Sequence, residues 1–202
     1  MTHPTGISSR TNRSINLRDL LFLIADPNAY LCTIVHSILR GFGATKVTEA
    51  RECTHALQAL SDQKIDILIC DALLPPYGGL KLTQAVRRNT KTENRTVPIL
   101  VMAGDSRATT IENARDAGAN MVIAKPISPA QLYDRLLWIA FNPRQFVDTP
   151  NYFGPDRRFK IEGYPNGVGR RKGDTAVEIG EATGPSLSQS DIDHLLNSAR
   201  AG

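Results

Sequence analysis

The sequence predicts one α/β domain with a doubly wound parallel sheet, followed by a C-terminal extension of different composition. Between Leu17 and Phe141, short apolar runs rich in Ile, Leu and Val alternate with segments of helical apolar spacing. After Phe141 the apolar content falls, and Arg, Gly and aromatic residues become frequent. A chain of 202 residues has room for one domain of ordinary size and substantial tails.

The apolar runs predict buried parallel strands, because each is short and most are almost uniformly hydrophobic. They are Leu20–Ala25, the weaker Lys46–Ala50, Ile65–Cys70, Val97–Ala103 and Met121–Ala124. A strand followed by a helix, repeated five times, predicts a doubly wound (βα)5 sheet with its functional site at the carboxyl ends of the strands.

Helices are predicted where apolar residues recur three and four positions apart. The stripes are Leu31, Ile34, Val35, Ile38 and Leu39; Leu57 and Leu60; Leu80, Leu82 and Val86; Ile111, Ala114 and Arg115, which is poorly apolar; and Leu132, Leu136, Leu137 and Ile139. Asn142–Pro143 ends the last helix, since proline lacks the backbone donor and disfavours helix at the residue before it.

Composition excludes several classes of protein. No apolar run reaches the roughly 18–20 residues of a membrane span, and the N-terminus lacks the apolar core of a signal peptide. Cys32, Cys53 and Cys70 lie in apolar stretches without metal-ligand spacing, which is typical of buried free thiols in a reducing compartment. We therefore expect a soluble cytoplasmic protein that is not inserted in a membrane.

Charged residues follow three of the predicted strands. Asp26 follows the first strand, Asp71 the third and Lys125 the fifth. The run ILICDALLPPYGGLKL around Asp71 and the run AKP around Lys125 resemble the receiver domain of bacterial response regulators, of which CheY is the single-domain example. The resemblance covers about residues 18–141. It implies Asp71 as phosphoacceptor, Lys125 as partner of the phosphoryl group, and Asp26 with Asp71 as magnesium ligands.

The sequence departs from the receiver pattern at three positions. Ala25 replaces one of the two acidic residues after the first strand, Met102 replaces the switch hydroxyl, and Val122 replaces the switch aromatic ring. Methionine cannot donate a hydrogen bond to a phosphoryl oxygen. We therefore expect weakened metal binding and poor coupling of Asp71 phosphorylation to an output surface. Two hypotheses stay open, a receiver kept as scaffold and a working phospho-switch.

The stretch Tyr152–Asp174 has the chemistry of a flexible guanine-nucleotide clamp and no helical or strand period. Six basic residues face three acidic ones between positions 151 and 174, an excess that suits an anionic ligand better than long DNA. Arginine grips phosphate and the guanine edge, and aromatic rings supply stacking surfaces. Arg171 to Asp174 fits R-x-x-D, and Asp156–Arg157–Arg158 offers the same pair in reverse. Cyclic di-GMP has the matching two guanines and two phosphates.

A receiver with such an extension resembles the Cle family of CheY-like cyclic di-GMP effectors. The resemblance implies binding of cyclic di-GMP as a stacked dimer and action on the flagellar motor. The arginines would bind guanine edges and phosphates or stack on the bases, the aspartates would read guanine N–H groups, and the aromatic rings would pack against the ligand. These residues are Arg157, Arg158, Arg170 and Arg171; Asp156 and Asp174; and Tyr152, Phe159 and Tyr164. The alternatives are a solvated basic linker or a patch for RNA or anionic lipid.

The C-terminal tail contains an amphipathic segment, LSQSDIDHLL, with Ser188 as a predicted N-cap. It resembles the N-terminal peptide of the flagellar switch protein FliM, which docks on CheY. This resemblance implies a FliM-like motor switch protein or CheY as partner. An ordinary capped helix lying on its own domain is the alternative.

The sequence thus predicts four segments: a disordered tail over 1–17, a receiver over 18–141, an arginine-rich, ligand-ordered segment over 142–182, and a linker with the FliM-like helix over 183–202. We expect a monomeric, non-enzymatic cyclic di-GMP effector that is recruited to the flagellated pole and controls motility and attachment. The alternative function is a conventional phosphorelay response regulator switched at Asp71.

Overall fold

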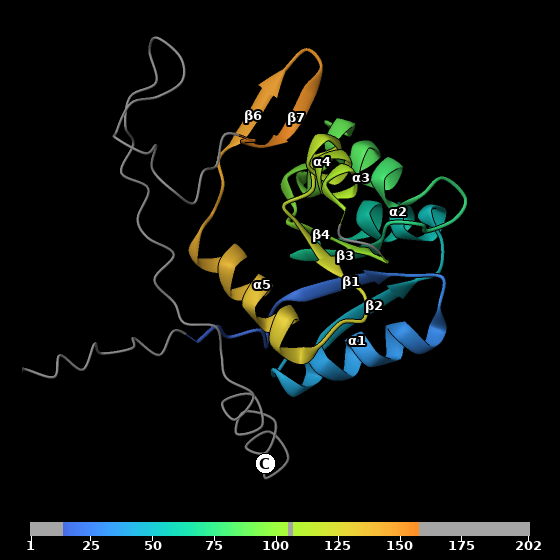
Figure 1. Ribbon diagram of the computed structural model, residues 1–202, viewed down its shortest axis with the longest axis vertical. Coiled ribbons are helices and arrows are strands. Elements are labelled where there is room, and N and C mark those ends of the chain that lie inside the picture. The colour runs from blue at the N-terminus through green and yellow to red at the C-terminus, as the bar shows by residue number, and fades with distance from the viewer. Residues whose placement is uncertain (1–13, 105–106, 158–202) are drawn as a thin grey trace, which may run out of the picture.

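The computed structural model describes residues 14–104 and 107–157, which form a five-stranded parallel sheet between two layers of helices (Figure 1). The strand order is β2-β1-β3-β4-β5. The strands are β1 Leu21–Ala25, β2 Lys46–Ala50, β3 Ile67–Asp71, β4 Ile99–Ala103 and β5 Met121–Ala124. Every predicted strand is present, Lys46–Ala50 included, and the predicted (βα)5 fold class is confirmed.

Helices cover both faces of the sheet, as the βα connections require. α1 Ala29–Gly41 and α5 Pro129–Phe141 lie on one face, and α2 Cys53–Asp62, α3 Gly79–Arg88 and α4 Ala108–Ala117 on the other, with a short 3₁₀ turn at Glu93–Thr96 (Figure 1). Helices α1 and α5 both begin with a side-chain cap. Asn28 accepts from the amides of Tyr30 and Leu31 at α1, and Ser128 forms a capping box with Gln131 at α5.

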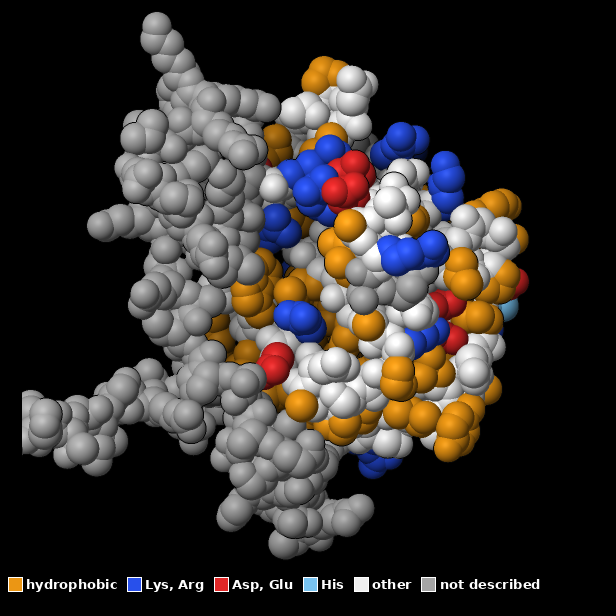
Figure 2. Space-filling view, in the orientation of Figure 1, with side chains coloured by type: hydrophobic (Ala, Val, Ile, Leu, Met, Phe, Trp, Pro, Cys, Tyr) orange, Lys and Arg blue, Asp and Glu red, His pale blue; other side chains and the backbone are white. Residues whose placement is uncertain are grey.

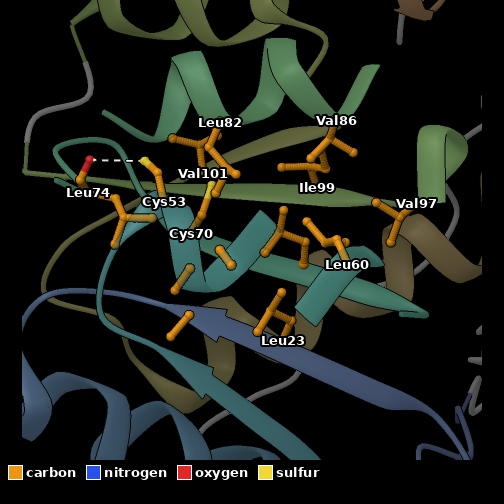
Figure 3. Packing of buried hydrophobic residues seen from close by; sticks show 14 of the residues in the cluster. Leu23, Cys53, Leu60, Cys70, Leu74, Leu82, Val86, Val97, Ile99 and Val101 are labelled. Atoms are coloured by element: carbon orange, nitrogen blue, oxygen red, sulfur yellow. Dashed lines mark hydrogen bonds between the residues drawn. The ribbon is translucent and has the colours of Figure 1, made fainter. Parts of the chain in front are cut away.

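The core consists of two apolar clusters, one on each side of the sheet. Every residue of β3 and β4 is buried, which is the pattern of central strands in a parallel sheet. Figure 3 shows the cluster beneath α2 and α3, where Leu82 and Val86 pack toward strand residues such as Ile99 and Val101. Cys32, Cys53 and Cys70 are buried and free, as predicted, and burial raises the pKa of the Cys70 thiol to about 12.

After α5 the chain forms an antiparallel hairpin of β6 Phe146–Thr149 and β7 Tyr152–Pro155 (Figure 1). Residues 152–155 thus form a strand in a stretch where the sequence shows no strand period. The hairpin is stabilised by tertiary contacts with the receiver, which a search for local apolar periodicity does not detect. The other predicted features of residues 158–202, the FliM-like helix among them, lie outside the described residues.

The N-terminal boundary also differs from the prediction. The sequence predicts a disordered tail over 1–17, but the side chain of Leu17 is buried in the cluster beneath α1 and α5, and Ile15 packs against the same cluster. Two apolar residues among polar neighbours are too few to show a period, so their burial is decided by the surface they meet. Residues 1–13 of the predicted tail lie outside the described part of the chain.

Candidate functional site

Three charged side chains meet at the carboxyl edge of the sheet. Asp71 is the last residue of β3, Asp26 directly follows β1, and Lys125 directly follows β5. Because β1 and β3 are paired neighbours, the two carboxylates emerge side by side. The sheet ladder continues one residue past β1 and β5, because the amide of Asp26 donates to the carbonyl of Ala50 and the amide of Lys125 donates to the carbonyl of Ala103. The structure therefore brings these three predicted residues together.

The ammonium group of Lys125 bridges both carboxylates. Its Nζ lies 2.7 Å from Oδ2 of Asp26 and 2.7 Å from Oδ1 of Asp71. Both aspartates are buried, whereas the lysine side chain is 24% exposed. Partial burial lowers the pKa of Lys125, but its hydrogen bonds and its electrostatic attraction to Asp26 and Asp71 together outweigh burial, and the net pKa is raised. Lys125 is thus a fixed cation between two anions.

The remaining carboxylate oxygens accept backbone hydrogen bonds. Oδ1 of Asp26 accepts from the amide of Asn28 at 2.8 Å, and Oδ2 of Asp71 accepts from the amide of Leu73 at 3.2 Å. These bonds fix the orientation of both carboxyl groups. A carboxylate held in this way beside a lysine can accept a phosphoryl group, whose charge the ammonium would neutralise.

The donor set fits a magnesium ion only in part. Asp26 and Asp71 offer hard carboxylate oxygens at one point, as Mg²⁺ prefers, and the ion keeps several waters in such sites. Across the described residues, no group of three or more His, Cys, Asp or Glu side chains could hold a metal. Ala25, the residue before Asp26, offers no carboxylate to this site. Lys125 already neutralises one of the two negative charges. Asp26 and Asp71 would hold the metal, in competition with Lys125.

The two residues expected at the switch positions, Met102 and Val122, are apolar. Met102 is fully buried beside Asp71 in the sheet register, in the apolar cluster beneath α1 and α5. Val122, on β5, is partly buried and packs against the opposite cluster. Neither side chain carries a polar group, so neither can form a hydrogen bond to a phosphoryl oxygen.

Arginine side chains of the receiver hold the hairpin. Arg87 on α3 is buried and donates to the backbone carbonyls of Arg95, Val97 and Gly118 at 2.7, 2.7 and 3.0 Å. Its guanidinium carbon lies 5.0 Å from the centre of the Phe146 ring of β6. Burial lowers the pKa of Arg87 to about 9, which still leaves a cation at neutral pH. The buried guanidinium group of Arg87 thus connects α3 with the turn before β5 and with the hairpin.

Arg95 makes a second contact with the hairpin. Its guanidinium carbon lies 3.4 Å from the centre of the Phe153 ring, and its Nη2 lies 3.3 Å from Oδ2 of Asp148. The ring of Phe153 also packs on Phe146, with centroids 5.4 Å apart. The sequence analysis did not identify Arg87 and Arg95, because neither lies in a recognisable motif. No local pattern marks either residue as a contact of the hairpin.

Of the residues predicted to bind nucleotide, the structure describes Tyr152, which begins β7 beside the hairpin turn, and Asp156 and Arg157, which directly follow β7. The guanidinium carbon of Arg157 lies 3.7 Å from the centre of the Tyr152 ring, a stacking contact, and Arg157 also pairs with Asp116 of α4 at 3.2 Å. The backbone amide of Asp156 donates to the carbonyl of Gln145 at 2.8 Å. The predicted residues Arg158, Phe159, Tyr164, Arg170, Arg171 and Asp174 lie outside the described part.

Comparison with known proteins points to one family. The model of the response regulator receiver domain matches residues 22–137. The chain is 29% identical over 114 residues to the chemotaxis protein CheY of Pseudomonas aeruginosa, which is 56% of this chain and 90% of that protein. It is 36% identical over 84 residues to the autoinducer 2 sensor kinase/phosphatase LuxQ of Vibrio vulnificus, which is 42% of this chain and only 10% of LuxQ.

A solved structure shows the same fold with a metal. It is the receiver domain of the sensor histidine kinase PA1611 of Pseudomonas aeruginosa PAO1, with a magnesium ion coordinated in its active-site cleft. The TM-score is 0.53 at 28% identity, and the match covers 59% of this chain and 94% of that one. Within the described residues, no helix is long and apolar enough to cross a membrane. The fold, the Asp26–Asp71–Lys125 cluster and the matching model together establish that this chain belongs to the response regulator receiver domain family.

Proposed function

We propose that the chain is a non-enzymatic, cyclic di-GMP-responsive effector in which the receiver carries an arginine-rich nucleotide-binding segment. The observation that carries this proposal is the stacking of Arg157 on Tyr152 at the point where that segment leaves the receiver. An arginine stacked on an aromatic ring presents its donors in the plane that a guanine edge or a phosphate recognises. The hairpin anchors this pair to the receiver through Arg87 and Arg95.

The apolar switch positions support a scaffold role for the receiver. With Met102 and Val122 in place of a hydroxyl and a ring, phosphorylation of Asp71 has no evident route to a change of surface. A ligand that orders the arginine-rich segment would supply the missing input, because ordering costs conformational entropy that stacking and charge-assisted hydrogen bonds offset.

We further propose that the output is the flagellar motor switch and that the protein acts as a monomer in the cytoplasm, recruited to the flagellated pole when ligand is bound. Similarity to a protein named for chemotaxis supports this direction. The FliM-like sequence at 187–202 supplies the second reason, since it would bind either this receiver or another CheY-type protein.

The test is calorimetric titration of the full-length chain with cyclic di-GMP. We expect binding with about two ligands per chain, as the two acid–arginine clusters imply, and loss of binding in the Arg170→Ala/Arg171→Ala variant. Arg40→Ala/Arg88→Ala is the matched control, because both arginines are exposed on receiver helices and their replacement removes the same two charges elsewhere. Absence of binding by the parent chain would overturn the proposal. Equal binding of cyclic di-GMP and short RNA, with a steep loss in salt, would favour a general anion patch instead.

The second candidate function is a phosphorelay receiver, and the bridging of Asp26 and Asp71 by Lys125 favours it. In this case the Asp71 carboxylate would attack the phosphorus of a phosphodonor and form an acyl phosphate. With acetyl phosphate as donor, acetate would leave. Intact mass spectrometry after incubation with acetyl phosphate and Mg²⁺ tests this function. A mass increase of one phosphoryl group that is absent in Asp71→Asn would support it, and an unchanged mass would exclude acetyl phosphate as a donor under those conditions.

A further inference from the structure

Two arginines from different parts of the chain converge on one carboxylate oxygen at the C-terminal end of α4. Arg115 of the receiver approaches Oδ1 of Asp116 through Nε at 3.4 Å, and Arg157 of the extension approaches the same oxygen through Nη1 at 3.2 Å. Arg157 also donates from Nη2 to the backbone carbonyl of Asp116 at 3.4 Å. Figure 2 shows basic side chains gathered around acidic ones over this part of the molecule, near the hairpin.

The position of Asp116 is unfavourable apart from these arginines. It lies in the last turn of α4, where the helix dipole and the free carbonyl groups repel a negative charge. Half of its side chain is exposed, as are about half of Arg115 and over a third of Arg157, so all three are accessible to a ligand. Ion pairs between side chains this exposed are weak and exchange readily.

The geometry around this oxygen is that of an anion site. Two guanidinium groups directed at a single oxygen form the arrangement by which arginines bind a phosphate oxygen, with charge-assisted hydrogen bonds from each. Arg157 is held for this role from two sides, by the ring of Tyr152 and by the hairpin backbone, where the Asp156 amide bonds to the Gln145 carbonyl. Its position therefore does not depend on Asp116 alone.

We propose that the carboxylate of Asp116 occupies the place of a phosphodiester oxygen of the cyclic dinucleotide, so that Arg115 is a receiver residue of the nucleotide site and Asp116 is its internal competitor. This inference rests on the proposed function. Ligand binding exchanges one anion for another between Arg115 and Arg157. The exchange brings the nucleotide into contact with α4, and it gives the extension a direct physical connection to the receiver.

The experiment is calorimetric titration of full-length variants with cyclic di-GMP at one fixed salt concentration. Asp116→Asn removes the competitor and is expected to tighten binding about two- to fivefold, the worth of an exposed ion pair. Arg115→Gln removes a ligand contact and is expected to weaken binding about five- to thirtyfold. A purely structural role of this cluster would shift both variants in the same direction.

Matched controls separate contact from net charge. Glu112→Gln removes the same charge from an exposed position one turn earlier on α4, and Arg88→Gln removes the same positive charge from α3. Both are expected to change the dissociation constant less than about twofold, since neither side chain pairs with Arg157 or Asp116 and exposed charges contribute little without a direct contact. If Asp116→Asn matches Glu112→Gln, or Arg115→Gln matches Arg88→Gln, the inference is overturned while the proposed function stands. If the parent chain does not bind, both are overturned.

Discussion

The Nε of Arg87 donates a hydrogen bond of 3.0 Å to the backbone carbonyl of Gly118, joining α3 to the turn between α4 and β5. The same turn lies against the hairpin, because a Cβ on Gly118 would lie 2.9 Å from Cγ of Arg87 and 3.1 Å from the carbonyl oxygen of Phe153. This contact makes residues 146–155 part of the receiver body. A conformational change in the residues after 157 would therefore begin next to a hairpin that is packed on the receiver.

Replacing Arg87 by methionine should destabilise the receiver by about 2–4 kcal/mol, because buried carbonyl groups of Arg95, Val97 and Gly118 would lose their donor. Urea unfolding followed by circular dichroism measures the effect. Arg88→Met, an exposed change on the same helix, should shift the free energy of unfolding by less than about 0.5 kcal/mol. Equal effects of the two substitutions would show that Arg87 does not organise this region.

Gly118→Ala should destabilise the protein more than Gly43→Ala does. Both glycines have positive φ, 98° and 90°, so alanine is strained by about 1 kcal/mol at either position. Only at Gly118 does the new Cβ collide with Arg87 and Phe153, whereas nothing lies within 4 Å at Gly43. The difference between the two variants in thermal unfolding isolates this collision, and we expect about 1–2 kcal/mol. If the two variants are equally stable, the hairpin does not pack on Gly118.

Lys125→Met should lower the free energy of unfolding by about 2–3 kcal/mol at neutral pH, since two buried carboxylates would face each other without a cation. The folded state raises the pKa of Lys125 above its ordinary 10.5. Its stabilising contribution is therefore complete below pH 10.5 and is lost as the pH rises through the raised value. Urea unfolding from pH 7 to 11.5 should show the parent and variant curves approaching each other above pH 10.5. Lys91→Met, at an exposed position, should show no such approach.

The same substitution should strengthen magnesium binding. In Lys125→Met the ammonium group no longer competes for the oxygens of Asp26 and Asp71, so the site gains one unit of negative charge. Backbone amide shifts of Asn28 and Leu73, whose N–H groups contact these carboxylates, report the titration with MgCl₂. We expect an affinity about tenfold higher than that of the parent. Unchanged or weaker binding would mean that Lys125 and the metal do not share the site.

Tyr152 separates ring stacking from hydroxyl hydrogen bonding in the proposed nucleotide site. Its hydroxyl donates to the carbonyl of Pro155 at 2.7 Å, while its ring supports Arg157. Tyr152→Phe keeps the ring and should cost about 0.5–1.5 kcal/mol of stability with little change in the affinity for cyclic di-GMP. Tyr152→Ala removes the stack and should weaken binding about fivefold or more. If both variants bind as tightly as the parent, Tyr152 does not orient Arg157 for ligand.

Much of the fold and the acid site could be predicted from the sequence, because their determinants repeat locally. Buried runs such as 67–71 and 99–103 give the strands of a parallel sheet directly. A polar residue that ends such a strand is placed at the carboxyl edge by topology alone, which is why Asp26, Asp71 and Lys125 could be grouped before their contacts were known.

The hairpin and its anchors could not be predicted in the same way. The run from Phe146 to Pro155 has no regular apolar alternation, and its strands are stabilised by Arg87, Arg95 and Gly118, which lie about 30 to 65 residues earlier in the chain. At the other end of the domain, the burial of Leu17 likewise could not be predicted from its local sequence.

The sequence by itself determined the receiver fold, the acid residues Asp26 and Asp71, and the apolar character of Met102 and Val122. These follow from residue type and from order along the chain. Only the tertiary structure decided that Lys125 bridges both aspartates, that the base of the extension is anchored, and that Asp116 holds Arg157. Such contacts join residues far apart in sequence, and their existence depends on packing and side-chain geometry that no local pattern encodes.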